Sequence, residues 1–397
     1  MNVDLTDSEL FASNKFWDAL AHLRRTEPVY WHPDADGGGF WALTRYDDIV
    51  EVYSSQDSFS NRYGMRLDSN ADAVAAVSQR MLSVSDPPNH TQLKRVLMQE
   101  FTPAKMRRLD DLMRKVVHEV VQDAVAVGEI DLVDVVKKIP NYVSCVMMGI
   151  PRADWEWIGQ ITTDAFEGAD EETRAAAHGE IFLFFTELLA DRRARPGDDF
   201  VSSIANARKA TDIPGSDRSL SDEEIIFNCN GVIAGANETT RYSAAGAVLA
   251  LAENPDEWAK LRRATQPGVE TAAEEVLRWT SPGVHALRTV VRSTEVGGVR
   301  FNVGDRVTLW NVSANRDEDV FDDPHQFRVD RSPNRHIAFG AGRHLCLGAR
   351  LARLELTVFL EALVQAARGF ELTAEPVYNG SNFTWGLRSL PIRLLPA

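Results

Sequence analysis

One segment near the end of the chain combines glycines, two histidines and a cysteine in a pattern that suits metal chemistry. It reads HIAFGAGRHLCLG from His336 to Gly348, and Cys346 lies just before an amphipathic run that predicts a helix. A helix N-terminus offers free N–H groups and the positive end of the helix dipole, and both stabilise a thiolate. The glycines permit tight turns and close approach of the backbone to a flat group. We therefore predict that Cys346 is a thiolate metal ligand rather than an ordinary buried cysteine in a glycine-rich turn.

The same segment resembles the haem-binding signature of the cytochrome P450 family, FGxGxHxCxG. The matching positions are Phe339, Gly340, Gly342, His344, Cys346 and Gly348. The resemblance implies haem b (iron protoporphyrin IX) as the cofactor, with Cys346 as the axial ligand of the iron. A thiolate in that place favours O–O bond cleavage. The resemblance also implies that His336 and His344 contact the haem propionates or lie close to them.

A pair of charged residues fits the same resemblance. Glu275 and Arg278 lie three residues apart in the helical run AAEEVLRW, so they share one helix face and can form an ion pair. Alone, the pair would be interpreted as a surface ion pair. Beside Cys346 it resembles the family's ExxR pair, which braces the core near the haem. The resemblance further implies that Arg316 joins this network and that Arg288 meets a propionate.

The segment Gly235–Thr240, GANETT, places an acid beside two hydroxyl groups inside a predicted helix. A threonine hydroxyl can bond the carbonyl group four residues back or release it, which suits proton transfer. From the segment alone, a polar surface patch is the alternative. The segment resembles the family's oxygen-activation motif, (A/G)GxETT, which implies that Thr239 steers protons and that Glu238 helps supply them. Ala236 stands where the family usually has glycine, and its methyl group is expected to narrow or bend the oxygen groove.

The segment Asp86–Arg95, DPPNHTQLKR, resembles another stretch of the family, DPPxHxxxR. The resemblance implies that His90 meets a propionate. Lys94 stands where arginine is common, and a lysine pairs with a carboxylate only as a point charge, without the bidentate fork of arginine. We expect Lys94 to contact the cofactor, with Arg95 as the alternative.

The elements that must position these residues are mostly helical. Apolar periodicity predicts helices over Met106–Val127, Tyr142–Met148, Arg152–Gly168, Glu171–Arg193, Asp222–Ala252 and Ala349–Arg368. Ser221 and Glu224 form a predicted capping box at the start of the long fifth helix. Short strands are predicted at Pro28–Trp31, Phe40–Thr44, Leu287–Val291 and Arg306–Leu309. The sequence therefore indicates one domain over residues 1–397, mainly α with a smaller β portion (α+β). The resemblance implies the cytochrome P450 fold, a triangular helical prism around a buried haem.

Composition limits the partners and the location of the protein. The formal net charge is −15, so the chain should repel nucleic acid, and we expect no nucleic-acid partner. Three cysteines are too few for a disulfide framework and indicate a reducing compartment. The polar first residues do not resemble a secretory signal, and no run of eighteen apolar residues predicts a membrane span. We expect a cytoplasmic monomer without a membrane contact.

The chain contains no flavin or iron–sulfur motif, so electrons are expected from a separate ferredoxin and ferredoxin reductase. Basic residues in segments that the family places on the proximal side of the haem predict a ferredoxin dock, namely Lys94, Arg95, Lys105, Arg107, Arg108, Arg343, Arg350 and Arg353. The resemblance places substrate-pocket residues at Arg62, Met65, Val232, Ala236, Val284 and Phe383. These predict a mostly apolar pocket in which Arg62 or Arg241 is a candidate anion contact.

Three hypotheses about function follow. The first is a haem-thiolate monooxygenase acting on a free small molecule in secondary metabolism. The second is the same chemistry on an acyl or aminoacyl group tethered to a carrier protein. The third is a non-catalytic relative that only recruits partners. It predicts loss of the thiolate or of the acid–alcohol pair, and both Cys346 and the pair Glu238–Thr239 are present.

Overall fold

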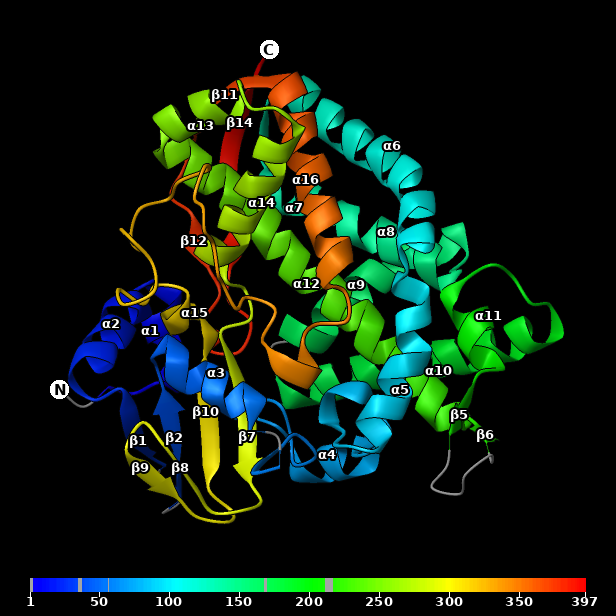
Figure 1. Cartoon of the computed structure of the whole chain (residues 1–397). Helices are drawn as coiled ribbons and strands as arrows, with labels where there is room; N and C mark the ends of the chain where they lie inside the picture. Colours follow the sequence, from blue (N-terminus) through cyan, green and yellow to red (C-terminus); the bar gives the residue numbers. More distant parts are fainter. Residues whose placement is uncertain (1–2, 35–37, 56, 168–169, 211–216) are drawn as a thin grey trace.

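The computed structural model describes residues 3–34, 38–55, 57–167, 170–210 and 217–397. Helices form most of it, and the strands gather mainly on one side, below and to the left in Figure 1. The predicted class, mainly α with a smaller β portion, is confirmed. Among the described helices, none is both long enough and apolar enough to cross a membrane.

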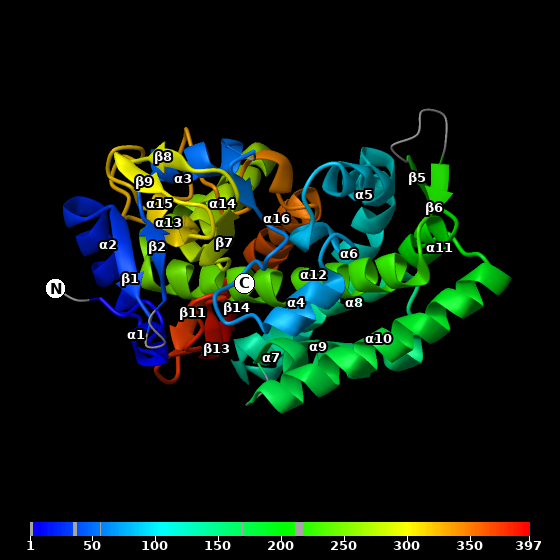
Figure 2. The same ribbon diagram turned by 90° about the horizontal axis from the view of Figure 1, so that it is seen from below.

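One long helix crosses the middle of the molecule. It is α12 (Asp222–Glu253), and Figure 2 shows it running across the centre of the view from below. The predicted capping box is confirmed, because the Glu224 N–H donates to Ser221 Oγ at 3.1 Å and the Ser221 N–H donates to the Glu224 carboxylate at 2.9 Å. The cap satisfies backbone groups that the first helical turn leaves unpaired.

Other helices pack around α12 and carry the remaining motif residues. Those that matter for the site are α5 (Asn89–Leu97), α8 (Lys138–Met148), α9 (Trp155–Glu167), α10 (Glu171–Ala194), α14 (Gln266–Thr280) and α16 (Ala349–Ala366). The other α-helices are α1 (Ser8–Ala12), α2 (Phe16–Thr26), α3 (Tyr46–Ser54), α4 (Ala71–Val77), α6 (Pro103–Val127), α7 (Leu132–Val136), α11 (Phe200–Ala205), α13 (Pro255–Leu261) and α15 (Asn311–Ala314). The helix predicted from Tyr142 begins earlier, at Lys138, because Pro140 lies in its first turn, where a missing N–H costs little.

A five-stranded sheet joins the beginning of the chain to the segment after α14. Its order is β1 (Val29–Pro33), β2 (Gly39–Leu43), β10 (Arg306–Trp310), β7 (His285–Val290) and β3 (Phe59–Ser60). All neighbours are antiparallel except β2 and β10, which are parallel. The sheet therefore fixes Arg288 on the interior strand β7. The last helix is predicted to Arg368 but ends at Ala366, because the backbone turns extended at Ala367 and continues as β11 (Ala367–Leu372) beside β14 (Pro391–Pro396).

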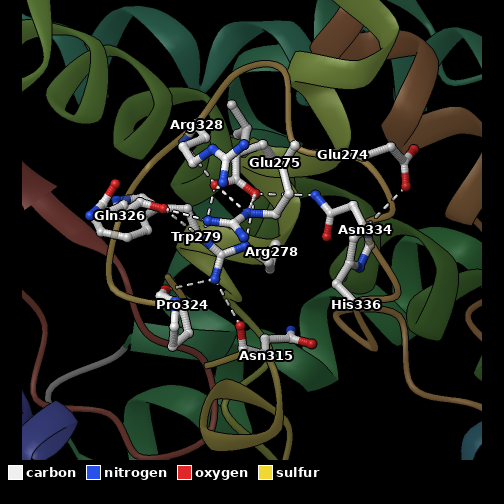
Figure 3. A network of polar contacts seen from close by, with 12 residues as sticks. Glu274, Glu275, Arg278, Trp279, Asn315, Pro324, Gln326, Arg328, Asn334 and His336 are labelled. Carbon is white, nitrogen blue, oxygen red and sulfur yellow. Dashed lines mark hydrogen bonds and ion pairs between the residues drawn. The ribbon is translucent and has the colours of Figure 1, made fainter. Parts of the chain in front are cut away.

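The ExxR pair lies at the centre of a buried network (Figure 3). Arg278 donates to both oxygens of Glu275 at 2.7 and 2.8 Å, and both side chains are fully buried. Arg331 donates to the same carboxylate at 3.0 and 3.1 Å. Arg278 also donates to the carbonyl groups of Asn315 and Pro324, each at 2.9 Å. The network therefore ties α14 to the loop that leads to the cysteine segment.

Arg316 does not occupy the place in this network that was predicted for it. Arg331 binds Glu275 instead, and no motif spacing in the sequence marks Arg331. The Arg316 guanidinium lies over the ring of Trp17 at 3.4 Å and over that of Trp279 at 4.6 Å, and it donates to the Trp279 carbonyl at 3.0 Å. Arg316 thus packs between two indole rings and links α2 to α14.

Replacing Glu275 by glutamine should strongly destabilise the protein, because Arg278 and Arg331 would lose the carboxylate that both share at full burial. We expect Glu275→Gln to lower the free energy of unfolding by about 3–5 kcal/mol. Glu371→Gln is the control, since this exposed side chain pairs with Arg393 at the surface and its loss should cost only about 1 kcal/mol. Chemical unfolding followed by circular dichroism measures both. Equal losses in the two variants would contradict this role of Glu275.

Candidate haem site

The loop before α16 carries Cys346 and is shaped by glycines with positive φ. Gly340 has φ +69° and Gly342 has φ +66°, a region that favours glycine, and a Cβ at Gly340 would lie 3.4 Å from the Tyr53 hydroxyl. The Cys346 N–H donates to the Phe339 carbonyl at 3.0 Å and closes the loop. Gly348 is the N-cap of α16, so the helix begins three residues after the cysteine.

The Cys346 side chain is left exposed by the surrounding loop, and yet protein atoms lie close enough around it that burial raises the pKa of its thiol. Opposing this, the backbone N–H of Gly348 and the cations of Lys94 and Arg353 lower the pKa of Cys346. The loop therefore supplies the donors and positive charge that a metal-bound thiolate needs.

A buried cluster of one arginine and two histidines lies beside this loop, and its members come from three separate segments. Arg288 on β7 is only 5% exposed, and its guanidinium donates to the Leu287 carbonyl at 2.8 Å. No carboxylate in the described part of the chain lies within ion-pair distance of it. The rings of His90 on α5 and His344 lie 4.0 Å apart, and His90 Nδ1 is buried without a hydrogen-bond partner.

Burial disfavours the protonated form of each side chain in this cluster and so lowers its pKa. Burial, followed by the Lys94 cation, lowers the pKa of His90 to about 4. Burial, followed by the Arg288 cation, lowers the pKa of His344 to about 2. Burial also lowers the pKa of Arg288. Such a set of donors is suited to an anion, because an opposite charge would offset the cost of desolvation.

The cavity between these groups fits the propionate edge of a haem. It is lined by Tyr53, Asp86, Arg288, Ala341 and His344, among others. Asp86 is the carboxylate in this lining, and the Ser60 hydroxyl at 2.5 Å and the Asn61 N–H at 2.9 Å hold it. The His90 nitrogen without a partner, the Arg288 cation without an ion pair and the exposed Cys346 thiol therefore fit haem, which has an iron and two acidic propionate groups. Tyr53, whose hydroxyl donates to Asn311 at 3.0 Å, belongs to this lining, and its sequence position gave no sign of it.

The structure contradicts the predicted propionate contact of His336. Its Nε2 pairs with the Glu274 carboxylate at 2.9 Å, and its Nδ1 accepts from the Ala338 N–H at 3.3 Å, so both ring nitrogens are occupied. Arg353 completes the group by donating to Glu274 at 2.6 Å. Burial alone would raise the pKa of Glu274, but hydrogen bonds from His336 and Arg353 hold it at about 2. His336 therefore fixes the start of the cysteine loop to α14.

Lys94 also contacts the loop rather than a free cavity. Its ammonium group donates to the carbonyl of Arg343 and, at 3.1 Å, to that of Leu345. Phe339 is partly buried against the main core, with the Arg353 guanidinium 4.7 Å above its ring. Lys94 thus supports the cysteine loop, and its contact with the cofactor stays a prediction.

A stripe of residues along α12 is left accessible inside the helical part of the molecule. Val232, Gly235, Ala236 and Thr239 are spaced on one helix face, and all are partly or fully accessible although α12 packs against helices on several sides. The Thr239 hydroxyl donates to the Gly235 carbonyl at 3.1 Å. The next face holds Glu238, which is 2% exposed, pairs with Arg241 and accepts from Thr163 of α9 at 3.2 Å.

The predicted substrate-pocket residues divide into two groups. Val232, Ala236, Met65 and Phe383 are partly buried, and Met65 is tied to β7 because the Leu287 N–H donates to its carbonyl at 3.0 Å. The prediction for Val284 is contradicted, because this residue is fully buried in a core cluster with Phe11 and Trp310. The buried Arg241 pairs with Glu238 and so is not free to hold an anion. Arg62 is exposed and stacks on Tyr63, and its contact with a substrate stays a prediction.

Comparison with known proteins agrees with this geometry. The family model "Cytochrome P450" matches residues 166–378. Linalool 8-monooxygenase of Pseudomonas putida is 36% identical over 99% of both chains, and cytochrome P450 NovI of Streptomyces niveus is 35% identical over 99% of this chain and 96% of its own. The crystal structure of P450 OxyD, described as involved in the biosynthesis of vancomycin-type antibiotics, superposes with a TM-score of 0.88 at 32% identity and full coverage of both chains.

The fold, the loop that carries Cys346 and the cavity beside that loop define a haem-thiolate type of protein. The chain belongs to the cytochrome P450 family. It is a cytochrome P450 monooxygenase, and its cofactor is haem.

Removing the Arg288 cation should weaken haem retention. A hydrogen bond to a charged group contributes about 1.5–3 kcal/mol, so we expect Arg288→Met to release haem about 10- to 100-fold faster. Transfer of haem to an excess of apomyoglobin, followed by absorbance, measures the rate. Arg292→Met is the control, because Arg292 is exposed just beyond the end of the same strand. Identical rates in both variants would show that Arg288 does not hold the cofactor.

Proposed function

We propose that this monooxygenase inserts oxygen into a C–H bond of a free, mainly apolar small molecule in secondary-metabolite biosynthesis. The observation that carries the proposal is the stripe of Val232, Gly235 and Ala236 beside Thr239, which offers a small apolar wall without a charge. Apolar walls with a few polar groups are typical of small-molecule pockets. Linalool 8-monooxygenase, at 36% identity, supports the substrate class by its name. OxyD, at 32% identity, supports the role in secondary-metabolite biosynthesis.

In this proposal the Cys346 thiolate would hold the haem iron, and Arg288, His90 and His344 would hold the propionate groups. When bound, haem supplies activation of O₂ and transfer of one oxygen atom to the substrate. The chain supplies the surroundings. The loop of Phe339, Gly340 and Gly348 presents the thiolate, and Lys94 fastens that loop through its carbonyl groups.

Thr239 and Glu238 are proposed to handle protons. The Thr239 O–H donates to the Gly235 carbonyl, so the lone pairs of the Thr239 oxygen remain able to accept a proton. To pass a proton on, the hydroxyl must release that carbonyl. Glu238 is held by Arg241 and Thr163, so its carboxylate must leave this ion pair before it can carry a proton to Thr239.

Monooxygenases of this family receive electrons from redox partners, and we propose a separate ferredoxin with its reductase. Within the predicted dock, Arg95, Arg107, Arg343 and Arg350 are exposed. Three others are engaged in ion pairs: Lys105 with Glu100, Arg108 with Asp198, and Arg353 with Glu274. The exposed four leave positive charge for an acidic partner. The cytoplasmic location and the monomeric state stay predictions.

A spectral titration of the ferric protein tests the substrate class. One series uses free linalool and free aromatic and polyketide acids, and the other uses the same acids loaded on a carrier protein. We expect the low- to high-spin shift with a free compound, because displacement of water from the iron needs only the apolar pocket. A shift that occurs solely with the loaded carrier would replace the proposal by the carrier-tethered alternative.

Thr239→Ala should keep haem and the red-shifted band of the reduced, CO-bound thiolate form. Positioned proton transfer contributes about 10²–10⁴-fold to rates, so we expect product formed per NAD(P)H to fall by at least about tenfold and peroxide to rise. Thr239→Ser is the control that keeps the hydroxyl group. An unchanged product yield in Thr239→Ala would remove Thr239 from the proton path.

A further inference from the structure

An arginine beside the predicted pocket residues is largely covered by the protein, and the sequence gave no sign of it. Arg66 directly follows Met65, and its side chain is 26% exposed. The Met65 carbonyl accepts from the Leu287 N–H at 3.0 Å, so this segment is bonded to β7 one residue before Arg288. Arg66 therefore lies next to the strand that carries the arginine of the haem site.

The Arg66 guanidinium lies over an aromatic ring. Its central carbon is 5.7 Å from the centre of the Phe383 ring. Phe383 is in turn bonded to the chain just before β7, because the Val284 N–H donates to the Phe383 carbonyl at 2.9 Å. A cation is attracted to the face of an aromatic ring, so Phe383 helps to fix the guanidinium in place. The two side chains thus combine a positive charge with an apolar surface.

Among the described carboxylates, only Asp68 lies within ion-pair distance of Arg66, and it is a weak partner. The closest contact is 3.1 Å, between Arg66 Nε and Asp68 Oδ1, and the Asp68 side chain is 62% exposed. Water screens such an exposed pair, so it contributes little. A guanidinium has five N–H donors, and one carboxylate leaves some of them available. Arg66 can therefore bind a second carboxylate in the paired geometry that arginine favours.

The positive charge of Arg66 reaches two histidines on other elements. Burial lowers the pKa of His178 on α10, and the Arg66 cation acts in the same direction. Burial also holds the pKa of His285 on β7 at about 4, and the Arg66 cation again contributes to the lowering. Both imidazoles are therefore neutral near neutral pH and add no charge of their own. Arg66 thus supplies a positive charge close to both α10 and β7.

The two arginines that the sequence suggested as anion contacts differ from Arg66. Arg241 is buried and pairs with the buried Glu238. Arg62 is exposed, and its guanidinium lies 4.6 Å from the centre of the Tyr63 ring. Arg66 combines a largely covered position with an ion-pair partner that is itself exposed. A ligand anion would therefore displace only a weak contact at Arg66.

We propose that Arg66 binds an anionic group of the substrate and that the substrate is an apolar carboxylic acid in its ionised form. The carboxylate binds the guanidinium, and the hydrocarbon part lies along Phe383 and the accessible Val232 and Ala236 of α12. The chain carries a net charge of −15, which repels an anion at a distance, so a fixed cation is needed to hold it. This role of Arg66 rests on the proposed function, and it narrows the free, apolar molecule to an acid.

Matched acids and alcohols test this role by binding alone. Citronellic, octanoic and decanoic acids are each compared with the alcohol of the same carbon skeleton. Isothermal titration calorimetry with the haem-loaded protein at neutral pH measures each Kd whether or not water leaves the iron. We expect the acids to bind the wild type more tightly than their alcohols. We expect Arg66→Met to weaken binding of the acids about 10- to 100-fold and to change that of the alcohols less than about twofold.

Two further variants separate the charge of Arg66 from its packing. Arg66→Lys keeps the cation and should restore part of the affinity for the acids. Arg62→Met is the matched control, because it removes an exposed arginine four residues earlier, and it should leave both series unchanged. The reduced, CO-bound spectrum verifies that every variant keeps thiolate-bound haem.

Several results would overturn the role of Arg66. They are acids that bind the wild type no better than their alcohols, an equal loss of both series in Arg66→Met, and an equal loss of the acids in Arg62→Met. If the alcohols still bind in these cases, the proposed function stands and only the acid site fails. If neither series binds and the protein responds only to a loaded carrier, the proposed function fails as well.

Discussion

The Glu275 carboxylate is the interaction on which the rest of the site depends. Arg278 and Arg331 share it, the Arg328 N–H donates to it at 2.9 Å, and Asn334 donates to it at 3.1 Å. A buried carboxylate is tolerated only when its oxygens are saturated in this way. Its saturation fixes the chain from 315 to 334 against α14.

The neighbouring residues extend this anchor to the cysteine loop. Glu274 holds His336, and the Asn315 side chain accepts from the Ile337 N–H at 2.7 Å, so the loop leaves α14 in a defined direction. This rigid attachment supports a neighbouring cluster in which the Arg288 cation, without an ion-pair partner among the described residues, lies beside the neutral rings of His90 and His344. The fold thus separates a neutralised network, which maintains the shape, from a cluster of donors that is suited to an anion.

Much of the site was predictable because its chemistry depends on local spacing. The cysteine segment, the ExxR pair and the capping box at Ser221 are each set by residues a few positions apart. The errors concern contacts between distant segments. The family resemblance names Arg316 as a partner of Glu275, but Trp17 and Trp279 pack around Arg316, and Arg331 binds Glu275 instead. Val284 was predicted to line the pocket, yet it lies just before β7 and is buried in one core cluster with Phe11.

Gly235 has a consequence for the shape of the reaction chamber. A Cβ built at this position meets no atom within 4 Å, whereas position 236, usually glycine in the family, carries a methyl group. The open space therefore lies at Gly235 and not at position 236, which is one residue further on, about 1.5 Å along the helix axis and about 100° around it. A bound molecule can approach the backbone beside the Thr239 hydrogen bond more closely on one side than on the other. The surface of α12 consequently selects a substrate by its shape. The selection comes from the methyl group that Gly235 lacks and not from a polar contact.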